Sequence, residues 1–160
     1  MPIDIFTTGG TIDKIYFDAK SSFEIGEPQI DMVLKDANLT IDYRVIPLLR
    51  KDSLDLTDED RALVRRAVAE SPRQKIIITH GTDPMVETAR SLAGIPAKTI
   101  VLTGAMQPAR FRFTDAIFNV ASAITAVQLL GEGVWIAING RIFNPDFVRK
   151  NVELNRFEVI

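Results

Sequence analysis

Short apolar runs alternate with longer amphipathic segments along the 160 residues of this chain. Continuous runs such as KIIIT and TIVLT are typical of strands buried in a parallel sheet. The pattern predicts strands at residues 3–7, 41–49, 75–79, 99–103 and 134–138. It predicts helices at residues 28–36, 57–70, 84–93 and 113–130. Strands that alternate with helices predict one α/β domain over residues 1–160, with three layers and a mostly parallel sheet flanked by helices.

The composition excludes several kinds of chemistry. The chain has no cysteine, which removes disulfides, thiolate nucleophiles and cysteine-based zinc sites. Its single histidine, His80, rules out a multi-histidine metal cage. Because His80 follows an apolar strand, we interpret it as a buried structural residue rather than a catalyst.

Charge and hydropathy exclude further classes of partner. A net charge of −2 gives no basic surface for nucleic acid. The longest nearly apolar stretch, residues 116–130, is too short and too polar to cross a membrane. The N-terminus has no basic segment followed by an apolar one, so we expect a cytoplasmic protein with no membrane partner.

The turn after the first predicted strand is the first candidate site, because open parallel sheets bind ligands beyond the carboxyl ends of their strands. Gly9 and Gly10 allow a tight turn and a close backbone approach to a ligand. They would hold the hydroxyl of Thr11 at the edge of the sheet. A purely structural turn is the alternative. The segment matches neither of the glycine-rich phosphate-binding patterns, which argues against a nucleotide.

The second candidate is the turn after the KIIIT strand, where Thr82 and Asp83 would face the same crevice as Thr11. The alternative reading makes Asp83 a helix cap before Pro84. Lys98, which precedes the TIVLT strand, could transfer protons if it is held beside Thr82 and Asp83 and if burial and neighbouring charges tune its pKa. A surface lysine with a partly buried stem is the alternative.

A third polar turn, with Asp52 and Ser53, follows the strand predicted at residues 41–49. Ser53 and nearby backbone donors could hold a carboxylate there, although an ordinary polar loop has the same composition. Asp115, farther along the chain, is best explained as a structural residue at a helix terminus.

Taken together, these motifs resemble one known family. The run TTGGTID at residues 7–13, the run THGTD at residues 79–83, and GAMQP followed by Asp115, Phe118 and Asn119 are similar to the bacterial-type L-asparaginase/glutaminase family. The resemblance covers nearly the whole chain but only the N-terminal, catalytic domain of the family. It therefore implies a catalytic domain over residues 1–160, without the family's C-terminal domain.

The resemblance also implies a role for each matching residue. Thr11 stands at the position of the nucleophile. Thr82, Asp83 and Lys98 match the second threonine, the aspartate that contacts the substrate's α-ammonium group, and a proton-transferring lysine. The remaining matches are the substrate-binding residues Gly10, Asp52 and Ser53, with Ser53 on the α-carboxylate. The implied reaction hydrolyses L-asparagine through an acyl-enzyme, with neither cofactor nor metal.

One departure from the family pattern concerns a loop tyrosine, whose place Phe23 takes in this chain. Tyr16, five residues after Thr11, is the natural substitute as a proton acceptor. Two alternative functions remain open, namely a glutaminase or amidase acting on another carrier, and an inactive amino-acid-binding domain. The missing second domain would leave apolar surface uncovered, so we expect a homodimer or homotetramer.

Overall fold

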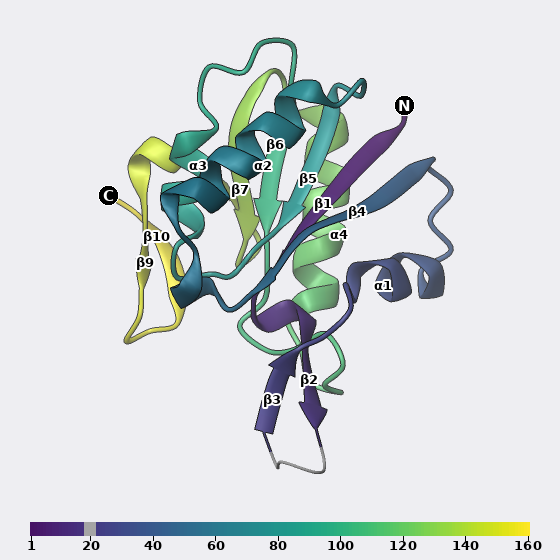
Figure 1. Ribbon diagram of the computed structural model, residues 1–160, viewed down its shortest axis with the longest axis vertical. Helices are drawn as coiled ribbons and strands as arrows, with labels where there is room; N and C mark the ends of the chain where they lie inside the picture. Colours follow the sequence, from purple (N-terminus) through teal and green to yellow (C-terminus); the bar gives the residue numbers. More distant parts are fainter. Residues whose placement is uncertain (18–21) are drawn as a thin grey trace.

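The computed structural model describes residues 1–17 and 22–160 and is built around one six-stranded sheet (Figure 1). The strand order is β4-β1-β5-β6-β7-β8. The strands are β1 (Ile3–Gly9), β4 (Tyr43–Lys51), β5 (Lys75–Thr79), β6 (Thr99–Thr103), β7 (Gly133–Ile138) and β8 (Arg141–Phe143). All neighbours pair in parallel except β8, which runs antiparallel to β7. This arrangement confirms the predicted α/β class.

Helices cover both faces of the sheet. Successive side chains of each central strand point to opposite sides, so each strand contributes to a core on either face. Ile77 and Val101 share one core with α1 (Ile30–Asp36) and α4 (Ala116–Leu129). Ile76 and Ile100 belong to the other core, with α2 (Asp58–Glu70) and α3 (Met85–Ser91). The continuous apolar runs of the sequence therefore reflect strands that are buried on both faces.

The start of α2 follows a local rule that the sequence already indicates. The Thr57 hydroxyl accepts a hydrogen bond from the Asp60 backbone N–H, and the Asp60 carboxylate accepts one from the Thr57 N–H. This reciprocal cap satisfies two donors that the first turn of a helix leaves without partners. By contrast, α4 begins at Ala116 rather than at residue 113, since residues 110–114 form a loop.

Two antiparallel hairpins lie outside the main sheet. The first pairs β2 (Lys14–Phe17) with β3 (Ser22–Ile25), and the second pairs β9 (Val148–Asn151) with β10 (Arg156–Val159). Short 3₁₀ turns precede both hairpins, at Thr11–Asp13 and Pro145–Phe147, and a third occupies Ser53–Asp55. Figure 1 shows the β2–β3 hairpin projecting beyond the carboxyl ends of the strands. The sequence predicted neither hairpin.

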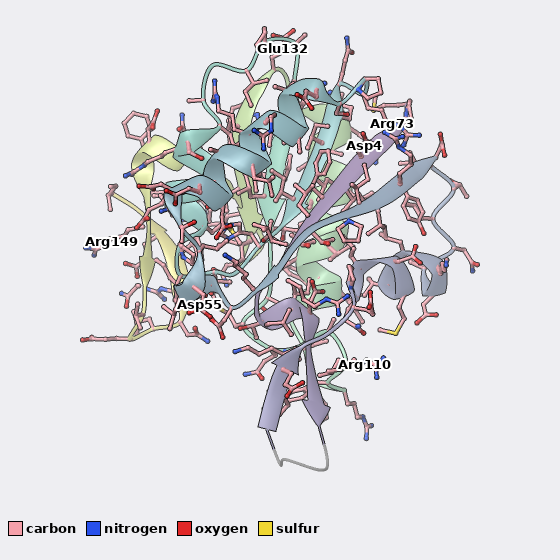
Figure 2. All side chains as sticks on the ribbon, in the orientation of Figure 1. Asp4, Asp55, Arg73, Arg110, Glu132 and Arg149 are labelled. Atoms are coloured by element: carbon pink, nitrogen blue, oxygen red, sulfur yellow. The ribbon has the colours of Figure 1, made fainter. Side chains whose placement is uncertain are left out.

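A buried ionic cluster joins the amino ends of the strands. The carboxylate of Asp4 is inaccessible to solvent and accepts hydrogen bonds from Arg44 at 2.7 and 2.8 Å and from the Ser71 hydroxyl at 2.6 Å. Arg73 lies 3.3 Å from the same carboxylate, and Figure 2 shows it beside Asp4 at this end of the molecule. Burial alone would raise the pKa of Asp4, but these hydrogen bonds and charges hold it below its usual value.

Candidate active site

Three turns meet at the carboxyl ends of the strands, and glycine is what lets them meet. Gly9 and Gly10 at the end of β1 have φ values of 95° and 83°, which favour glycine. A Cβ atom on Gly10 would lie 2.6 Å from the backbone nitrogen of Gly81, and one on Gly81 would lie 2.1 Å from the Cβ of Ser53. The turns that carry Thr11, Thr82 and Ser53 are therefore in direct contact.

Thr11 begins the 3₁₀ turn directly after this glycine pair, and it is partly exposed. Among the described residues, nothing forms a hydrogen bond with its hydroxyl, which leaves the oxygen accessible to a ligand. The Gly10 N–H, in contrast, donates to the carbonyl of Lys51 at 3.0 Å. Gly10 therefore shapes the turn, while its own N–H is bonded to Lys51 rather than directed at a ligand.

A lysine that the sequence analysis did not identify contacts the second turn. Lys150 Nζ donates a hydrogen bond to Thr82 Oγ1 at 2.7 Å and lies 2.5 Å from the Asp83 carboxylate. Thr82 is buried, the Lys150 side chain is 11% exposed, and that of Asp83 is 47% exposed. The three groups form a charged, hydrogen-bonded unit whose aspartate faces solvent. Asp83 does not cap α3, since Pro84 holds the N-cap position.

Lys98 lies at the opposite end of the sheet. It precedes β6, and its Nζ donates to the backbone carbonyls of Ser71 at 2.5 Å and Arg73 at 2.6 Å. Burial lowers the pKa of Lys98, while the charge of Asp4 acts to raise it. The prediction that Lys98 lies beside Thr82 is therefore wrong, because a residue before a parallel strand is placed at the amino edge.

Lys150 escaped the sequence analysis because it belongs to β9, in a segment that we assigned to no element. One signal could have revealed it. Val148 is buried and Lys150 follows two residues later, so both side chains point to the same side of the strand. A lysine on the inward-facing side of a short strand calls for a partner of opposite charge or a hydroxyl.

The third turn holds a network of its own. Asp52 accepts a hydrogen bond from the Leu54 N–H at 3.3 Å and lies 3.4 Å from Lys14. Burial acts to raise the pKa of Asp52, but the Leu54 hydrogen bond and the Lys14 charge lower it overall. The Ser53 hydroxyl is 3.5 Å from the same carboxylate. Asp52, Ser53 and Lys14 thus place one anion, one hydroxyl and one cation beside the glycine turns.

His80 is held within the core, as the sequence analysis expected. Its Nδ1 donates to the carbonyl of Gly81 at 2.7 Å, and its Nε2 accepts from the Thr88 hydroxyl at 2.8 Å. Burial lowers the pKa of His80 to about 4, so the ring is neutral near pH 7. Asp115 is also structural, because it accepts the backbone N–H groups of Met106 and Gln107. The side chain of Tyr16 lies outside the described part of the structure.

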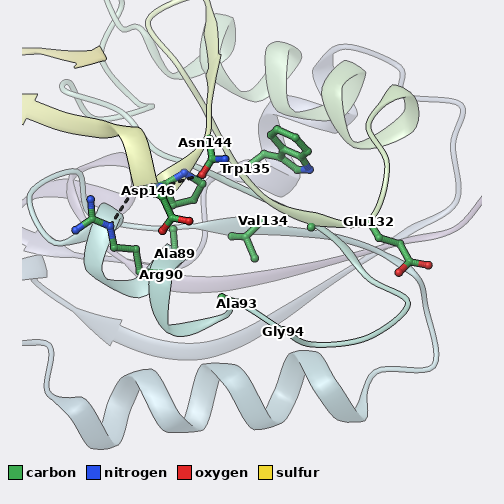
Figure 3. A pocket seen from close by; sticks show the side chains of 11 residues that line it. Ala89, Arg90, Ala93, Gly94, Glu132, Val134, Trp135, Asn144 and Asp146 are labelled. Carbon is green, nitrogen blue, oxygen red and sulfur yellow. Dashed lines mark hydrogen bonds between the residues drawn. The ribbon is translucent and has the colours of Figure 1, made fainter. Parts of the chain in front are cut away.

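A separate cavity of about 300 Å³ lies at the other end of the molecule (Figure 3). The end of α3, the start of β7 and the turn before β9 line it, and Trp135 and Arg90 are among its side chains. None of the three candidate turns reaches it. Among the described residues, no group of three or more histidine, aspartate or glutamate side chains is arranged to hold a metal ion. No helix of the described residues is long and apolar enough to cross a membrane.

The sequence profile of one protein family, described as "Asparaginase, N-terminal", matches residues 2–158. The chain belongs to the asparaginase family. Its sequence is 31% identical to the L-asparaginase of Thermococcus kodakarensis, over 100% of this chain and 51% of that protein. A solved structure of the thermostable L-asparaginase from the same organism superposes with a TM-score of 0.85 at 27% identity, covering 100% of this chain and 51% of that one.

Two further comparisons agree. A probable periplasmic L-asparaginase of Haemophilus influenzae is 28% identical over 92% of this chain and 46% of its own length. The structure of a probable cytoplasmic L-asparaginase from Campylobacter jejuni has a TM-score of 0.79 at 27% identity, covering 99% of this chain and 51% of that one. The chain therefore spans about half the length of the relatives that it matches.

Proposed function

We propose that this protein hydrolyses L-asparagine to L-aspartate and ammonia, with Thr11 as the nucleophile. The observation that carries the proposal is the contact of Lys150 with both Thr82 and Asp83, beside the glycine turn that presents Thr11. A hydroxyl accessible to a ligand, on a turn that touches the turn of a lysine-bonded threonine, supports nucleophilic catalysis, in which a neighbouring base activates the nucleophile.

In the first step, Thr11 Oγ attacks the side-chain amide carbon of asparagine. The amide nitrogen leaves as ammonia and takes up the proton that the Thr11 hydroxyl loses, which leaves an ester. The backbone N–H groups of Thr11 and Thr82 are the donors for the oxyanion, since the Gly10 N–H is already bonded to Lys51. Each well-placed donor of this kind contributes about 3–4 kcal/mol in other enzymes.

In the second step, a water molecule hydrolyses the ester and restores the Thr11 hydroxyl. The Thr82 hydroxyl and the amine of Lys150, 2.7 Å apart, are the groups that exchange protons with this water. The exposed Asp83 carboxylate binds the substrate's α-ammonium group, and Ser53 with Lys14 receives its α-carboxylate. Lys150 therefore replaces Lys98 in the set of catalytic residues, while Asp52 holds Lys14 in place.

The proton acceptor for Thr11 in the first step stays a prediction. Tyr16 is proposed for it because it lies five residues after Thr11 in the adjacent strand β2. A phenol has an unperturbed pKa of about 10, so a neighbouring charge must lower it for work at neutral pH. Tyr16→Phe keeps the ring and removes only the hydroxyl, and kcat should fall by about 10²-fold or more if the role is correct.

The central experiment measures ammonia release from asparagine and from glutamine at millimolar concentration. We expect release from asparagine, with glutamine slower, and no release from Thr11→Ala or Thr82→Ala. Thr11→Ser is the matched control, because it keeps the nucleophilic hydroxyl. Release from glutamine alone would favour a glutaminase. Binding of aspartate without any release would favour an inactive amino-acid-binding domain.

The surface of the protein supports a further part of the proposal, that residues 1–160 form a catalytic domain that assembles into a homodimer or homotetramer. Large apolar side chains are exposed on and beside α4, namely Phe113, Ile117, Phe118 and Leu129. Light scattering should give a mass at least twice that of one chain, and a monomer at micromolar concentration would contradict the proposal. A cytoplasmic location also stays a prediction, since the names of the relatives place one in the cytoplasm and another in the periplasm.

A further inference from the structure

Asp13 stands where the Thr11 turn meets the β2–β3 hairpin. Its backbone N–H donates to the carbonyl of Gly10 at 3.1 Å, on the side of the nucleophile. Its carbonyl accepts the N–H of Gly26 at 2.8 Å, directly after β3. Its carboxylate accepts the N–H of Gln29 at 2.9 Å. One residue therefore holds the start and the end of the hairpin together, two positions after the proposed nucleophile.

The Asp13 carboxyl is unusual because it is buried without a cation in contact. The residue is 2% exposed, and among the described residues no ion pair reaches it. Burial raises the pKa of Asp13 to about 7, against the opposing effects of the Gln29 hydrogen bond and the more distant charge of Arg50. Asp13 therefore changes its charge near neutral pH, where an ordinary aspartate is fully ionised.

A cavity beside this carboxyl leaves room for a neighbouring side chain to move when the charge of Asp13 changes. It measures about 230 Å³ and is lined by Asp13, Gly26, Pro28 and residues 47–50 of β4. Arg50, on its wall, is paired instead with the exposed carboxylate of Glu27 at 2.5 Å. Arg50 therefore lies near two carboxyl groups, that of Asp13 before the hairpin and that of Glu27 after it.

The other charged groups around Asp13 already have partners. Lys14, the next residue, is paired with Asp52 on the far side of the turn. Arg110, labelled in Figure 2 beside the hairpin, donates to the Gln29 side-chain oxygen at 2.9 Å. The Arg50–Glu27 pair is therefore the ion pair beside the cavity that can rearrange when Asp13 loses its proton.

We propose that Asp13 is a positioning residue that sets the place of the β2–β3 hairpin relative to Thr11 according to its protonation. The neutral carboxyl holds the hairpin base as seen in the structure, with Arg50 on Glu27. The ionised carboxylate draws Arg50 away from Glu27 into the cavity and displaces the hairpin base. The effect on turnover rests on the proposed function, whereas the rearrangement itself does not.

The first test needs no turnover, because the Gln29 amide proton reports the charge of its acceptor. Its NMR chemical shift should titrate with a midpoint near pH 7 in the parent protein. Arg50→Gln should move the midpoint upward, and Glu27→Gln, which frees Arg50 for Asp13, should move it downward. Asp36→Asn, which changes an exposed carboxyl on α1, is the matched control and should leave the midpoint unchanged. A midpoint near pH 4 in the parent, or one that neither Arg50→Gln nor Glu27→Gln shifts, would overturn the proposal.

The second test follows the kinetics with pH. If only the neutral form holds the hairpin correctly, the competent fraction falls about tenfold between pH 6 and pH 8, and KM should rise by that factor while kcat stays level. Asp13→Asn keeps the oxygen that accepts from Gln29 and cannot ionise, so its KM should stay flat over the same range. An equal rise of KM in Asp13→Asn would refute the positioning role. Ammonia release that fails at every pH would refute the proposed function, while the amide titration would still decide this one.

Discussion

The two ends of the sheet carry the same kinds of side chain and use them differently. At the amino end, Lys98 donates hydrogen bonds to backbone carbonyls, and Asp4 is enclosed by two arginines and a serine. At the carboxyl end, Lys150 contacts one hydroxyl and one carboxylate, and Asp83 faces solvent. Composition alone does not separate a structural cluster from a candidate catalytic one. The difference lies in exposure, because the Asp4 carboxylate is fully enclosed whereas that of Asp83 is 47% exposed.

The largest expected effect separates the two lysines by activity. Lys150→Met should lower kcat by about 10²-fold or more, because it removes an acid–base group next to Thr82. Lys98→Met is the matched control and should keep the parent's kcat, since its Nζ touches no group at the carboxyl end. Steady-state ammonia release under saturating asparagine measures both variants. Equal losses of kcat in the two folded variants would contradict the assignment.

The next effect concerns stability at the amino end. Asp4→Asn should lower the free energy of unfolding by about 3 kcal/mol at pH 7, because it removes the buried carboxylate that pairs with Arg44 and Arg73. The pKa of Asp4 is lowered in the folded protein, so its carboxylate stabilises the fold above the unfolded pKa of about 3.9. That stabilisation is lost as the pH falls through the folded value.

Urea unfolding of Asp4→Asn and the parent at several pH values checks this prediction. The difference between the two proteins should shrink as the solution is acidified below pH 4. Asp83→Asn, at the open end, should lower the free energy of unfolding by only about 1 kcal/mol, because the Asp83 side chain that pairs with Lys150 is 47% exposed. A similar loss for both variants at pH 7 would show that the two ends do not differ in the way described.

The smallest effect is that of Lys98 on stability. Lys98→Met leaves the carbonyls of Ser71 and Arg73 without their buried donor, which should cost about 1–3 kcal/mol. Lys35→Met, on the exposed face of α1, removes only a surface ion pair with Asp31 and should cost less stability than Lys98→Met. Thermal unfolding measures both. A Lys98→Met variant as stable as the parent would contradict the prediction and show that the carbonyls of Ser71 and Arg73 do not depend on Lys98.

The sequence predicted the parts of this molecule that follow from periodicity. The strands KIIIT and TIVLT and the capped helix α2 appear where the apolar pattern places them. The α/β class and the family are likewise confirmed. The two hairpins were missed because strands of four residues are too short to show a clear alternation. The proposed roles of Thr11, Thr82 and Asp83 stay predictions.

The site was harder to predict than the fold because its lysine comes from a distant segment. The resemblance matched Lys98 to the family's lysine, but Lys98 precedes the TIVLT strand, and a residue before a parallel strand lies at the amino edge, away from Thr82. Lys150 reaches Thr82 through the β9–β10 hairpin, whose Val148 and Phe157 are anchored in the core. The packing of those two side chains and the pairing of β9 with β10 hold the lysine at the turn.

That hairpin also sets the time at which the site can exist. During synthesis, the turn with Thr11 leaves the ribosome before the turn with Thr82. Lys150 emerges only after all five strands of the parallel sheet have been made. A growing chain can therefore form most of its sheet before the amine of Lys150 is in place beside Thr82. The proposed site is therefore completed only after the strands that carry Thr11 and Thr82 have been made.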